Sequence, residues 1–260
     1  MRFYGDYHVH TSYSDGKQDI EEAVKGAKEK GLKEVAITEH GPAVMVIGVE
    51  EEEVYYQIKD QIARINESGD EVKVYLGAEA NICGMNGELD LSPHLREELD
   101  VLIAGLHPYT YPSSLKDGWE LQGKNMLRHL GKGFRARAIN NNTKACVEAL
   151  YNHPGLDILA HPGLFFEVDY EEVARACSKT GTLFEINCGH KHPPLSDIIK
   201  VNKVGACFII NSDAHFKDTV GDLAYGAYVV EKAGLAPNAV ANLDEGGGIS
   251  WIKKKRCIYL

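Results

Sequence analysis

The sequence lacks the signatures of several common classes of protein. It contains no apolar run that approaches the roughly 18 residues of a membrane-spanning helix. Its first six residues have no apolar core of the kind found in signal peptides, so we expect a cytoplasmic protein without a membrane partner. The six cysteines never form a Cys-x-x-Cys pair, which disfavours a zinc finger or a disulfide-stabilised fold and predicts reduced thiols.

Positive charge is also scarce. The chain has 28 Lys and Arg residues against 38 Asp and Glu residues, which gives a net charge of −10. Such a balance disfavours a broad groove that binds nucleic acid, but it is compatible with a local basic patch. Neither a Gly-x-Gly-x-x-Gly motif after the first expected strand nor a P-loop motif occurs, so the sequence lacks a phosphate cradle of those two kinds.

What the sequence does contain is an alternation of apolar strands and amphipathic helices. Its 260 residues, 44% hydrophobic, suffice for one large core. Seven strands are expected, at residues 3–9, 34–38, 72–82, 99–106, 157–160, 182–187 and 205–211. Helices are expected near residues 19–30, 50–67, 140–152, 170–179, 195–203 and 219–233. We therefore predict a single domain over residues 1–260, with a seven-stranded α/β barrel favoured over a doubly wound open sheet.

Candidate metal ligands stand where these strands end. His8 and His10 share one face of the first strand, because side chains alternate, and can converge on one ion. Asp213 and His215 repeat this spacing after the last strand. Three more histidines follow apolar runs: His40, His107 and His161. Since functional groups gather at the carboxyl ends of barrel strands, the sequence predicts a metal site at one mouth of the barrel.

A carboxylate and a further histidine extend this set. Glu79 lies near the end of the third strand, and its two oxygens could bridge two cations about 3.5–4 Å apart. An exposed strand carboxylate is an equally good interpretation of Glu79 by itself. His190 follows the sixth strand and is a candidate for lining the mouth, whereas Cys188 is expected to be a core thiol rather than a nucleophile.

Residues 107–137 interrupt the alternation of strands and helices. This segment carries several glycines and prolines, and it has six basic residues against two acidic ones. Either it forms a substrate loop over the barrel mouth, in which Arg135 or Arg137 binds a phosphate, or it is a solvated surface excursion.

Six motifs resemble those of the PHP (polymerase and histidinol phosphatase) superfamily and occur in the same order. They are His8-Val9-His10-Thr11 with Ser14-Asp15-Gly16, Ala36-Ile37-Thr38-Glu39-His40-Gly41, Gly77-Ala78-Glu79, Ala104-Gly105-Leu106-His107, Ala160-His161-Pro162-Gly163 and Ser212-Asp213-Ala214-His215. Residues 77–91 are most similar to the bacterial YcdX-type phosphatases. The resemblance implies a distorted (β/α)7 TIM-like barrel, a trinuclear metal centre and hydrolysis of phosphoesters.

The resemblance also implies a set of ligands for two to three divalent ions. The first ion would be held by His8, His10, Glu79 and Asp213, the second by Glu79, His107 and His161, and the third by Asp15, His40 and His215. Zinc, manganese or iron is expected, and magnesium is admissible. A hydroxide between the first two metals would attack phosphorus, because coordination lowers the pKa of bound water.

Two positions depart from the relatives. Asp15 stands where the YcdX type has His, and Glu39 stands where Asp is usual. A carboxylate oxygen is a harder ligand than imidazole, which favours iron, manganese or magnesium over zinc at the third site.

We expect a metal-dependent phosphoesterase, foremost a phosphomonoesterase acting on a small phosphorylated metabolite. Histidinol phosphate, a sugar phosphate and a nucleotide are equally admissible substrates. Three alternatives stay open: a nuclease or phosphodiesterase of the same superfamily, a metal-binding regulatory barrel without turnover, and an amidohydrolase-like barrel that cleaves C–N bonds. The sequence does not specify an oligomeric state.

Overall fold

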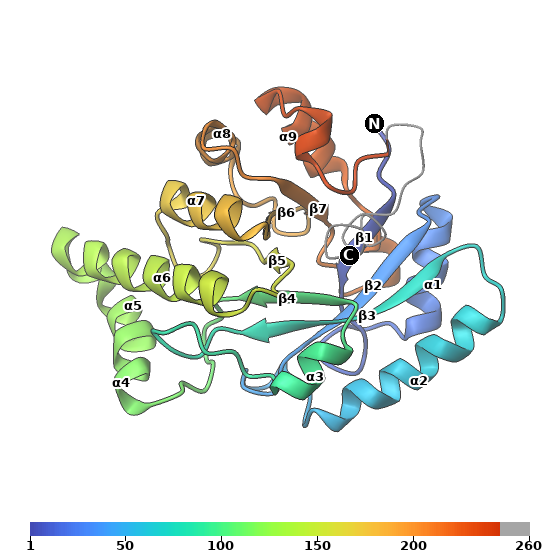
Figure 1. Cartoon of the computed structure of the whole chain (residues 1–260), viewed down its shortest axis with the longest axis horizontal. Helices are drawn as coiled ribbons and strands as arrows, with labels where there is room; N and C mark the ends of the chain where they lie inside the picture. The colour runs from blue at the N-terminus through green and yellow to red at the C-terminus, as the bar shows by residue number, and fades with distance from the viewer. Residues whose placement is uncertain (245–260) are drawn as a thin grey trace.

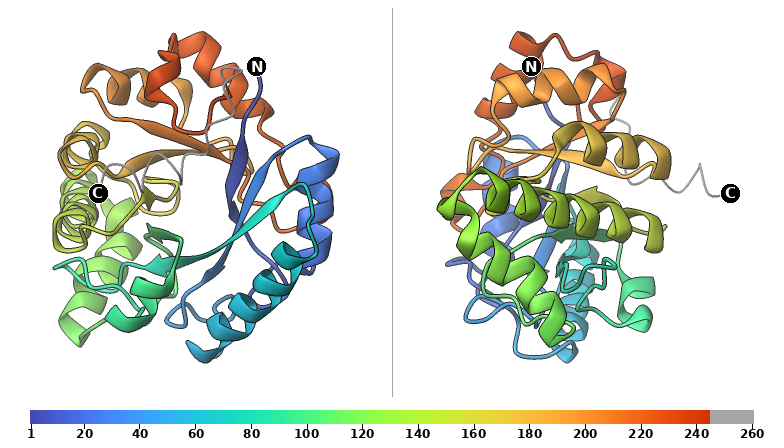
Figure 2. Two further views of the ribbon diagram at one scale, coloured as in Figure 1. Left: turned by 45° about the vertical axis from the view of Figure 1, so that its right-hand side comes forward. Right: turned by 90° about the vertical axis from the view of Figure 1, so that its left-hand side faces the viewer.

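Seven parallel strands form one sheet in which each strand pairs with its neighbours in the sequence. In this computed structural model, which describes residues 1–244, the strands are β1 (Gly5–Val9), β2 (Glu34–His40), β3 (Lys73–Asn81), β4 (Val101–Gly105), β5 (Ile158–Leu159), β6 (Leu183–Asn187) and β7 (Phe208–Asn211). Figures 1 and 2 show these strands at the centre of the molecule with the helices around them. The predicted distorted (β/α)7 barrel is confirmed. Its extension as a single domain to residue 260 stays a prediction, since the structure describes only residues 1–244.

Helices connect these strands, and two of them show clear capping residues. The helices are α1 (Ile20–Glu29), α2 (Glu53–Glu67), α3 (Pro93–Glu98), α4 (Leu115–Asp117), α5 (Lys124–Leu127), α6 (Lys132–Asn152), α7 (Tyr170–Thr180), α8 (Leu195–Lys203) and α9 (Ala224–Ala233). Asp19 caps α1 in a capping box with Glu22, and Gly181 ends α7 with a φ of 78°. Among the helices of residues 1–244, none is long and apolar enough to cross a membrane.

The barrel closes through a thin seam between β1 and β7. Val9 forms an isolated parallel bridge with Ala214, and the His10 N–H donates to the Ala214 carbonyl at 2.9 Å. Away from the mouth, Asn242 fills the seam. Its side-chain amide donates to the carbonyls of Gly5 and Ile210, while its side-chain oxygen accepts from the Ile210 N–H. A short return segment therefore joins the first and last strands where they do not pair directly.

Apolar side chains fill both faces of the sheet. A large cluster lies between the strands and helices, and a smaller cluster of residues from alternate strand positions fills the barrel interior. At the floor of that interior the hydroxyls of Tyr7 and Tyr75 donate to Glu34 at 2.6 and 3.0 Å. Below the mouth the barrel is packed by side chains, and the buried polar group at its floor, Glu34, is paired with the two tyrosine hydroxyls.

Residues 107–137 differ from the loop that the sequence suggested. From Leu115 onward they are mostly helical, with α4, a π-helix (Gly118–Gly123), α5 and a 3-10 turn (Arg128–Leu130) in succession. The long helix α6 begins at Lys132, eight residues before the expected start near 140. Gly131, with a φ of 152°, separates the two helical parts, and α4–α6 project to one side of the molecule (left in Figure 1). Gly118, Gly123 and Gly133 lie within helical elements, so the glycines of this segment do not mark an irregular loop.

His153, just after α6, predicts a pH dependence of stability. Arg96 donates to His153 Nδ1 at 2.6 Å, so the ring is neutral and donates from Nε2 to the Gly87 carbonyl at 2.9 Å. Burial, and then the Arg96 charge, hold the pKa of His153 below its ordinary value. The neutral pairing therefore contributes stability above about pH 6.5, and this contribution is lost as the pH falls and the unfolded chain takes up the proton.

We expect the free energy of unfolding to fall less between pH 7 and pH 5 in His153→Gln than in the wild type. Glutamine can keep both hydrogen bonds without titrating. Urea unfolding of both proteins with chelator present measures the difference between the two slopes. Equal slopes would show that His153 does not couple folding to protonation.

Candidate metal centre

The polar side chains at the barrel mouth come from the carboxyl ends of the strands and the loops after them. His8 lies on β1 and His10 follows it, while Val9 between them packs outward into the large apolar cluster. His40 ends β2, Glu79 lies near the end of β3, and other members follow β4, β5 and β7: His107, His161 and Asp213. The alternation inferred from His8-Val9-His10 is present, and the ring centroids of His8 and His10 are 5.0 Å apart.

Glu79 is fully buried at the centre of this group. Its Oε1 lies 2.9 Å from His161 Nε2 and 3.2 Å from His107 Nε2. Its Oε2 lies 3.0 Å from His40 Nδ1, 3.2 Å from His8 Nε2 and 3.5 Å from His10 Nε2. The two carboxylate oxygens thus face separate groups of imidazoles, which is the arrangement expected of a carboxylate that bridges two cations.

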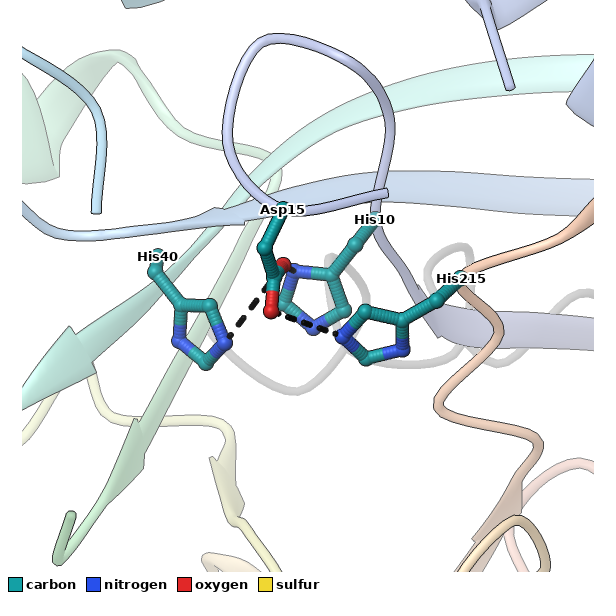
Figure 3. A group of neighbouring side chains, drawn as sticks. All are labelled: His10, Asp15, His40 and His215. Atoms are coloured by element: carbon teal, nitrogen blue, oxygen red, sulfur yellow. Dashed lines mark hydrogen bonds and ion pairs between the residues drawn. The ribbon is translucent and has the colours of Figure 1, made fainter. Parts of the chain in front are cut away.

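A second group stands beside the first. His10, Asp15, His40 and His215 offer ligand atoms that all lie within 4.8 Å of one another (Figure 3). Asp15 Oδ2 is 3.2 Å from His215 Nε2, and Asp15 Oδ1 is 3.9 Å from His40 Nε2. His10 and His40 belong to both groups, because each also contacts Glu79.

Asp213 connects the first group to the rim. Its Oδ1 lies 3.3 Å from His10 Nε2 and 3.5 Å from His8 Nε2, while its Oδ2 lies 3.5 Å from His190 Nε2. The backbone of Asp213 has a φ of 54°, which is uncommon for a residue other than glycine and turns the chain back toward the mouth.

Several residues that position these ligands were not singled out from the sequence. Glu185, buried on β6, contacts His8 Nδ1 at 2.7 Å and accepts from the His161 N–H at 2.8 Å. Asn81 contacts His107 Nδ1 at 2.8 Å, and Asn187 donates to Asp213 at 2.9 Å. Such partners fix the orientation of a ligand and leave its other atom free to bind. The sequence did offer one indication of these supporting residues. Glu185 and Asn187 are polar side chains two residues apart in an otherwise apolar strand, so they share one face of it.

Glu39 organises the loop that carries Asp15. Its carboxylate accepts hydrogen bonds from the Thr11 N–H and hydroxyl and from the Ser14 hydroxyl. Burial raises the pKa of Glu39 to about 7 against these hydrogen bonds. The departure at position 39 therefore falls on a residue that holds a loop rather than on a predicted ligand.

Electrostatics at the centre favour ionised carboxylates. Burial alone would raise the pKa of Glu79, but His8, His107 and His40 together hold that pKa well below its usual range. Burial likewise opposes ionisation of Asp15, yet His215 and the nearby imidazoles lower its pKa to about 2. Burial also lowers the pKa of His10 to about 4, which keeps that imidazole neutral. Burial opposes protonation of His8, His40, His161 and His215 as well, but the adjoining carboxylates raise the pKa of each of them. A divalent cation that binds here would therefore displace protons from these imidazoles.

Two observations show that the residues fit divalent cations. Buried polar atoms without a hydrogen-bond partner in the described part of the chain gather here: His8 Nε2, both ring nitrogens of His10, His40 Nδ1 and Glu79 Oε2. The backbone also leaves room, because a Cβ at Gly105 would lie 2.9 Å from His107 Cε1 and 3.2 Å from Glu79 Oε1. Buried polar groups are normally paired, so unpaired ligand atoms that face one centre indicate an ion between them.

A cavity of about 460 Å³ opens over the centre. Its lining includes Asp15, His40, His107, His161, Asp213 and His215, together with His190 and Phe165. His190 therefore lies at the mouth. Arg135 and Arg137 are exposed on α6 and do not line this cavity, and Arg135 forms an ion pair with Glu167. The nine side chains that we predicted as metal ligands thus lie together at the barrel mouth. The contact of Arg135 and Arg137 with substrate stays a prediction.

Cys188 lies close to the rim but is buried as a thiol. The Gly226 N–H donates to its sulfur at 3.3 Å, and burial raises the pKa of Cys188 far above its ordinary value. A thiolate is the nucleophilic form, so this cysteine is unsuited to attack. We expect Cys188→Ser to keep at least about half of the wild-type turnover, measured as phosphate release. A loss of turnover with normal metal content would contradict the assignment of Cys188 to the core.

The parallel barrel and the carboxylate-bridged histidine cluster define a class, the metal-dependent hydrolases that bind their ions at the carboxyl ends of barrel strands. Residues 6–187 match the model of the PHP domain. The chain belongs to the PHP domain family, and within it to the metal-dependent phosphoesterases.

Relatives in two organisms align with almost the entire chain. A protein of Syntrophotalea carbinolica named "Probable phosphatase" is 29% identical over 91% of this chain and 90% of its own length. Another of that name, from a Thermoanaerobacter species, is 28% identical over 98% of this chain and 97% of its own length. The histidinol phosphate phosphatase of Lactococcus lactis, solved with zinc, L-histidinol and phosphate, shares the fold with a TM-score of 0.59. It is 17% identical, and the match covers 90% of this chain and 94% of that one.

Proposed function

We propose that this protein is a phosphomonoesterase that binds two to three divalent cations and hydrolyses a small phosphorylated metabolite. Zinc, manganese or iron would occupy the centre, with magnesium admissible. Histidinol phosphate, a sugar phosphate and a nucleotide are the candidate substrates. The observation that supports this most is the position of Glu79, whose carboxylate faces five imidazoles that are buried and lie within 3.5 Å.

In this proposal the ligands divide among the ions as the family motifs imply. His8, His10, Glu79 and Asp213 hold the first, Glu79, His107 and His161 the second, and Asp15, His40 and His215 the third. Bound cations supply charge that neutralises phosphoryl oxygens and lowers the pKa of coordinated water. Asp15, Glu79, Asp213 and the adjoining Glu185 contribute four negative charges, so a centre loaded with three divalent ions keeps a positive charge that attracts a phosphate dianion.

In this proposal the other residues at the mouth bind the substrate phosphate or orient the metal ligands. Burial lowers the pKa of His190, so its imidazole is neutral near pH 7 and can hydrogen-bond a phosphate oxygen at the rim. Glu185 and Asn81 keep the rings of His8 and His107 directed at the centre. Phe165 packs beside His161, with ring centroids 5.6 Å apart, and limits the access of water from that side.

The test combines metal analysis with phosphate release. Purified protein is assayed with phosphomonoesters, a phosphodiester and histidinol phosphate, with and without added Mn²⁺ or Zn²⁺. Two to three metals per chain and chelator-sensitive monoester cleavage support the proposal. Cleavage of the diester alone would indicate a nuclease or phosphodiesterase, and bound metal without any phosphate release would favour a regulatory barrel or C–N hydrolysis. Absence of bound metal would contradict the metal centre.

Substrate contact by α6 gives a separate prediction. If this helix binds phosphate, Arg135→Ala and Arg137→Ala should each raise KM by up to roughly fivefold with little change in kcat, since an exposed charge pair contributes at most about 1 kcal/mol. Glu167→Gln is the control, because it releases Arg135 from its ion pair without removing the cation. An unchanged KM in both arginine variants would assign this helix face to the solvated surface.

A further inference from the structure

A second cavity, of about 500 Å³, adjoins the cavity over the metal centre. Ile47, His107 and Phe165 line both. The rest of its lining is Val44, Met45, Val46, Pro108 and Tyr109. Among these described residues none is charged, and the His107 ring and the Tyr109 hydroxyl are the only polar side-chain groups. We call this second space the apolar cavity.

The loop after β2 and the loop after β4 pair with each other and form one wall of the apolar cavity. Val44, in the loop after β2, forms an antiparallel bridge with Thr110, in the loop after β4. The Met45 N–H donates to the Tyr109 carbonyl at 3.2 Å, and the Tyr111 N–H donates to the Ala43 carbonyl at 2.7 Å. The wall is therefore tied by backbone hydrogen bonds rather than formed by free side chains.

Two apolar side chains of this wall, Val46 and Tyr109, are exposed to solvent, and both residues have an unusual backbone conformation. Val46 has a φ of 75° and Tyr109 a φ of 62°, values that branched and bulky residues rarely adopt. Val46 is fully exposed and Tyr109 is 71% exposed. Strained residues persist where the surroundings enforce them, and they cluster at ligand sites. Strain at two positions of this wall, with apolar side chains left uncovered, indicates a surface shaped to be covered by a ligand.

His107 separates the two cavities. Its Nδ1 contacts Asn81 at 2.8 Å and its Nε2 faces Glu79 at 3.2 Å, so both nitrogens are engaged on the side of the metal centre. The ring thus offers carbon atoms to the apolar cavity. A molecule whose phosphate lies at the metal centre can place its adjoining atoms in the apolar cavity by passing the boundary that His107, Ile47 and Phe165 form.

We propose that the apolar cavity binds the organic part of the substrate and selects phosphomonoesters of apolar alcohols. This inference rests on the proposed phosphomonoesterase function. In the reaction, a bond forms between phosphorus and the oxygen of water, the bond between phosphorus and the alcohol oxygen breaks, and the alcohol leaves protonated. Selection by this cavity narrows the candidate substrates of the proposed function, because sugar hydroxyls or the ammonium group of histidinol would lose hydration in it without gaining partners.

The experiment compares n-alkyl phosphates from ethyl to hexyl on the metal-loaded protein, because their leaving groups share nearly the same chemistry and differ only in apolar length. We expect kcat/KM to rise about two- to fourfold per methylene, in line with the transfer of a methylene group from water to an apolar site. Glycerol phosphate and histidinol phosphate should be poorer substrates than hexyl phosphate.

Two variants test whether the dependence of kcat/KM on chain length arises in the apolar cavity. Ile47→Ser and Met45→Ser should each lower the ratio of kcat/KM for hexyl over ethyl phosphate by roughly five- to tenfold. The matched control is Ile199→Ser, on α8, a partly exposed isoleucine that does not line the apolar cavity. It should keep the wild-type ratio. If Ile47→Ser fails to fold, Met45→Ser still tests the inference, because Met45 is exposed and its replacement should not disturb the core.

Binding of n-alkylphosphonates, measured by calorimetry on the metal-loaded protein, separates this inference from the proposed function. Dissociation constants that fall with chain length support the apolar cavity even if no ester is hydrolysed, in which case the phosphomonoesterase proposal alone fails. Phosphate release or phosphonate binding that is independent of chain length would overturn the inference and leave the enzyme. A dimer in sedimentation that Met45→Ser dissociates would also overturn it, since a second copy would then cover the cavity.

Discussion

Replacing Glu79 by Gln is expected to lower kcat/KM for phosphate release by roughly a thousandfold or more. Glutamine has the same shape, so the barrel should fold, but a neutral amide cannot bridge two cations. Its NH2 group would also point at imidazole nitrogens that need an anionic or metal partner. Metal analysis by mass spectrometry should show fewer ions per chain, because two of the three proposed sites share this carboxylate.

The matched control is Glu185→Gln. Glu185 is also buried and contacts His8, but only at the nitrogen that faces away from Glu79. Loss of such an orienting carboxylate usually costs about ten- to a hundredfold in metal affinity or activity, so the Glu185 variant should be clearly less impaired than the Glu79 variant. Near-normal rates and metal content in Glu79→Gln would refute the bridged centre.

Removal of the metals is expected to abolish phosphate release and to destabilise the fold together. Three carboxylates and six imidazoles converge at the mouth, and several of their ligand atoms are buried without partners in the described residues. An ion present at a thousand times its dissociation constant contributes about 4 kcal/mol of stability. For a chain of this length, that corresponds to roughly 8–16 °C in Tm.

Thermal unfolding with chelator and with added Zn²⁺ or Mn²⁺ measures this shift independently of turnover. Glu79→Gln should show a smaller metal-dependent shift than the wild type, because its remaining ligands bind fewer ions. Equal Tm values for the wild-type protein in chelator and in metal would argue that the cluster of imidazoles and carboxylates folds without ions.

The sequence predicted the barrel and the gathering of its ligands for one physical reason. Parallel strands deliver their carboxyl ends to one edge, so His40, His107 and His161 could be placed together from the strand preceding each. The spacing of His8 and His10 predicted a shared face, and the structure shows both rings directed at Glu79. These inferences needed only local periodicity and the topology of alternating strands and helices.

The supporting residues and the apolar cavity could not be predicted in that way. Glu185 lies in a strand that is buried on both sides, and its contact with His8 joins residues 177 positions apart. The apolar cavity depends on loops that meet only after folding, and Val46 and Tyr109 adopt backbone conformations that their residue types disfavour. Local preference is overridden there by the tertiary structure. The helices within residues 107–137 were missed because each is too short to show a clear period.

The thin seam between β1 and β7 has a consequence for how the protein is made. His8 and His10 are synthesised before the other strands, whereas Asp213 and His215, which both lie against His10, follow the last strand of the barrel. Asn242, which ties Gly5 to β7, follows later still. A nascent chain therefore exposes half of a metal centre until the ring closes. Since the ligands of both strands meet only in the closed ring, the full set of ligands that we propose for the first ion forms only after β7 has joined β1.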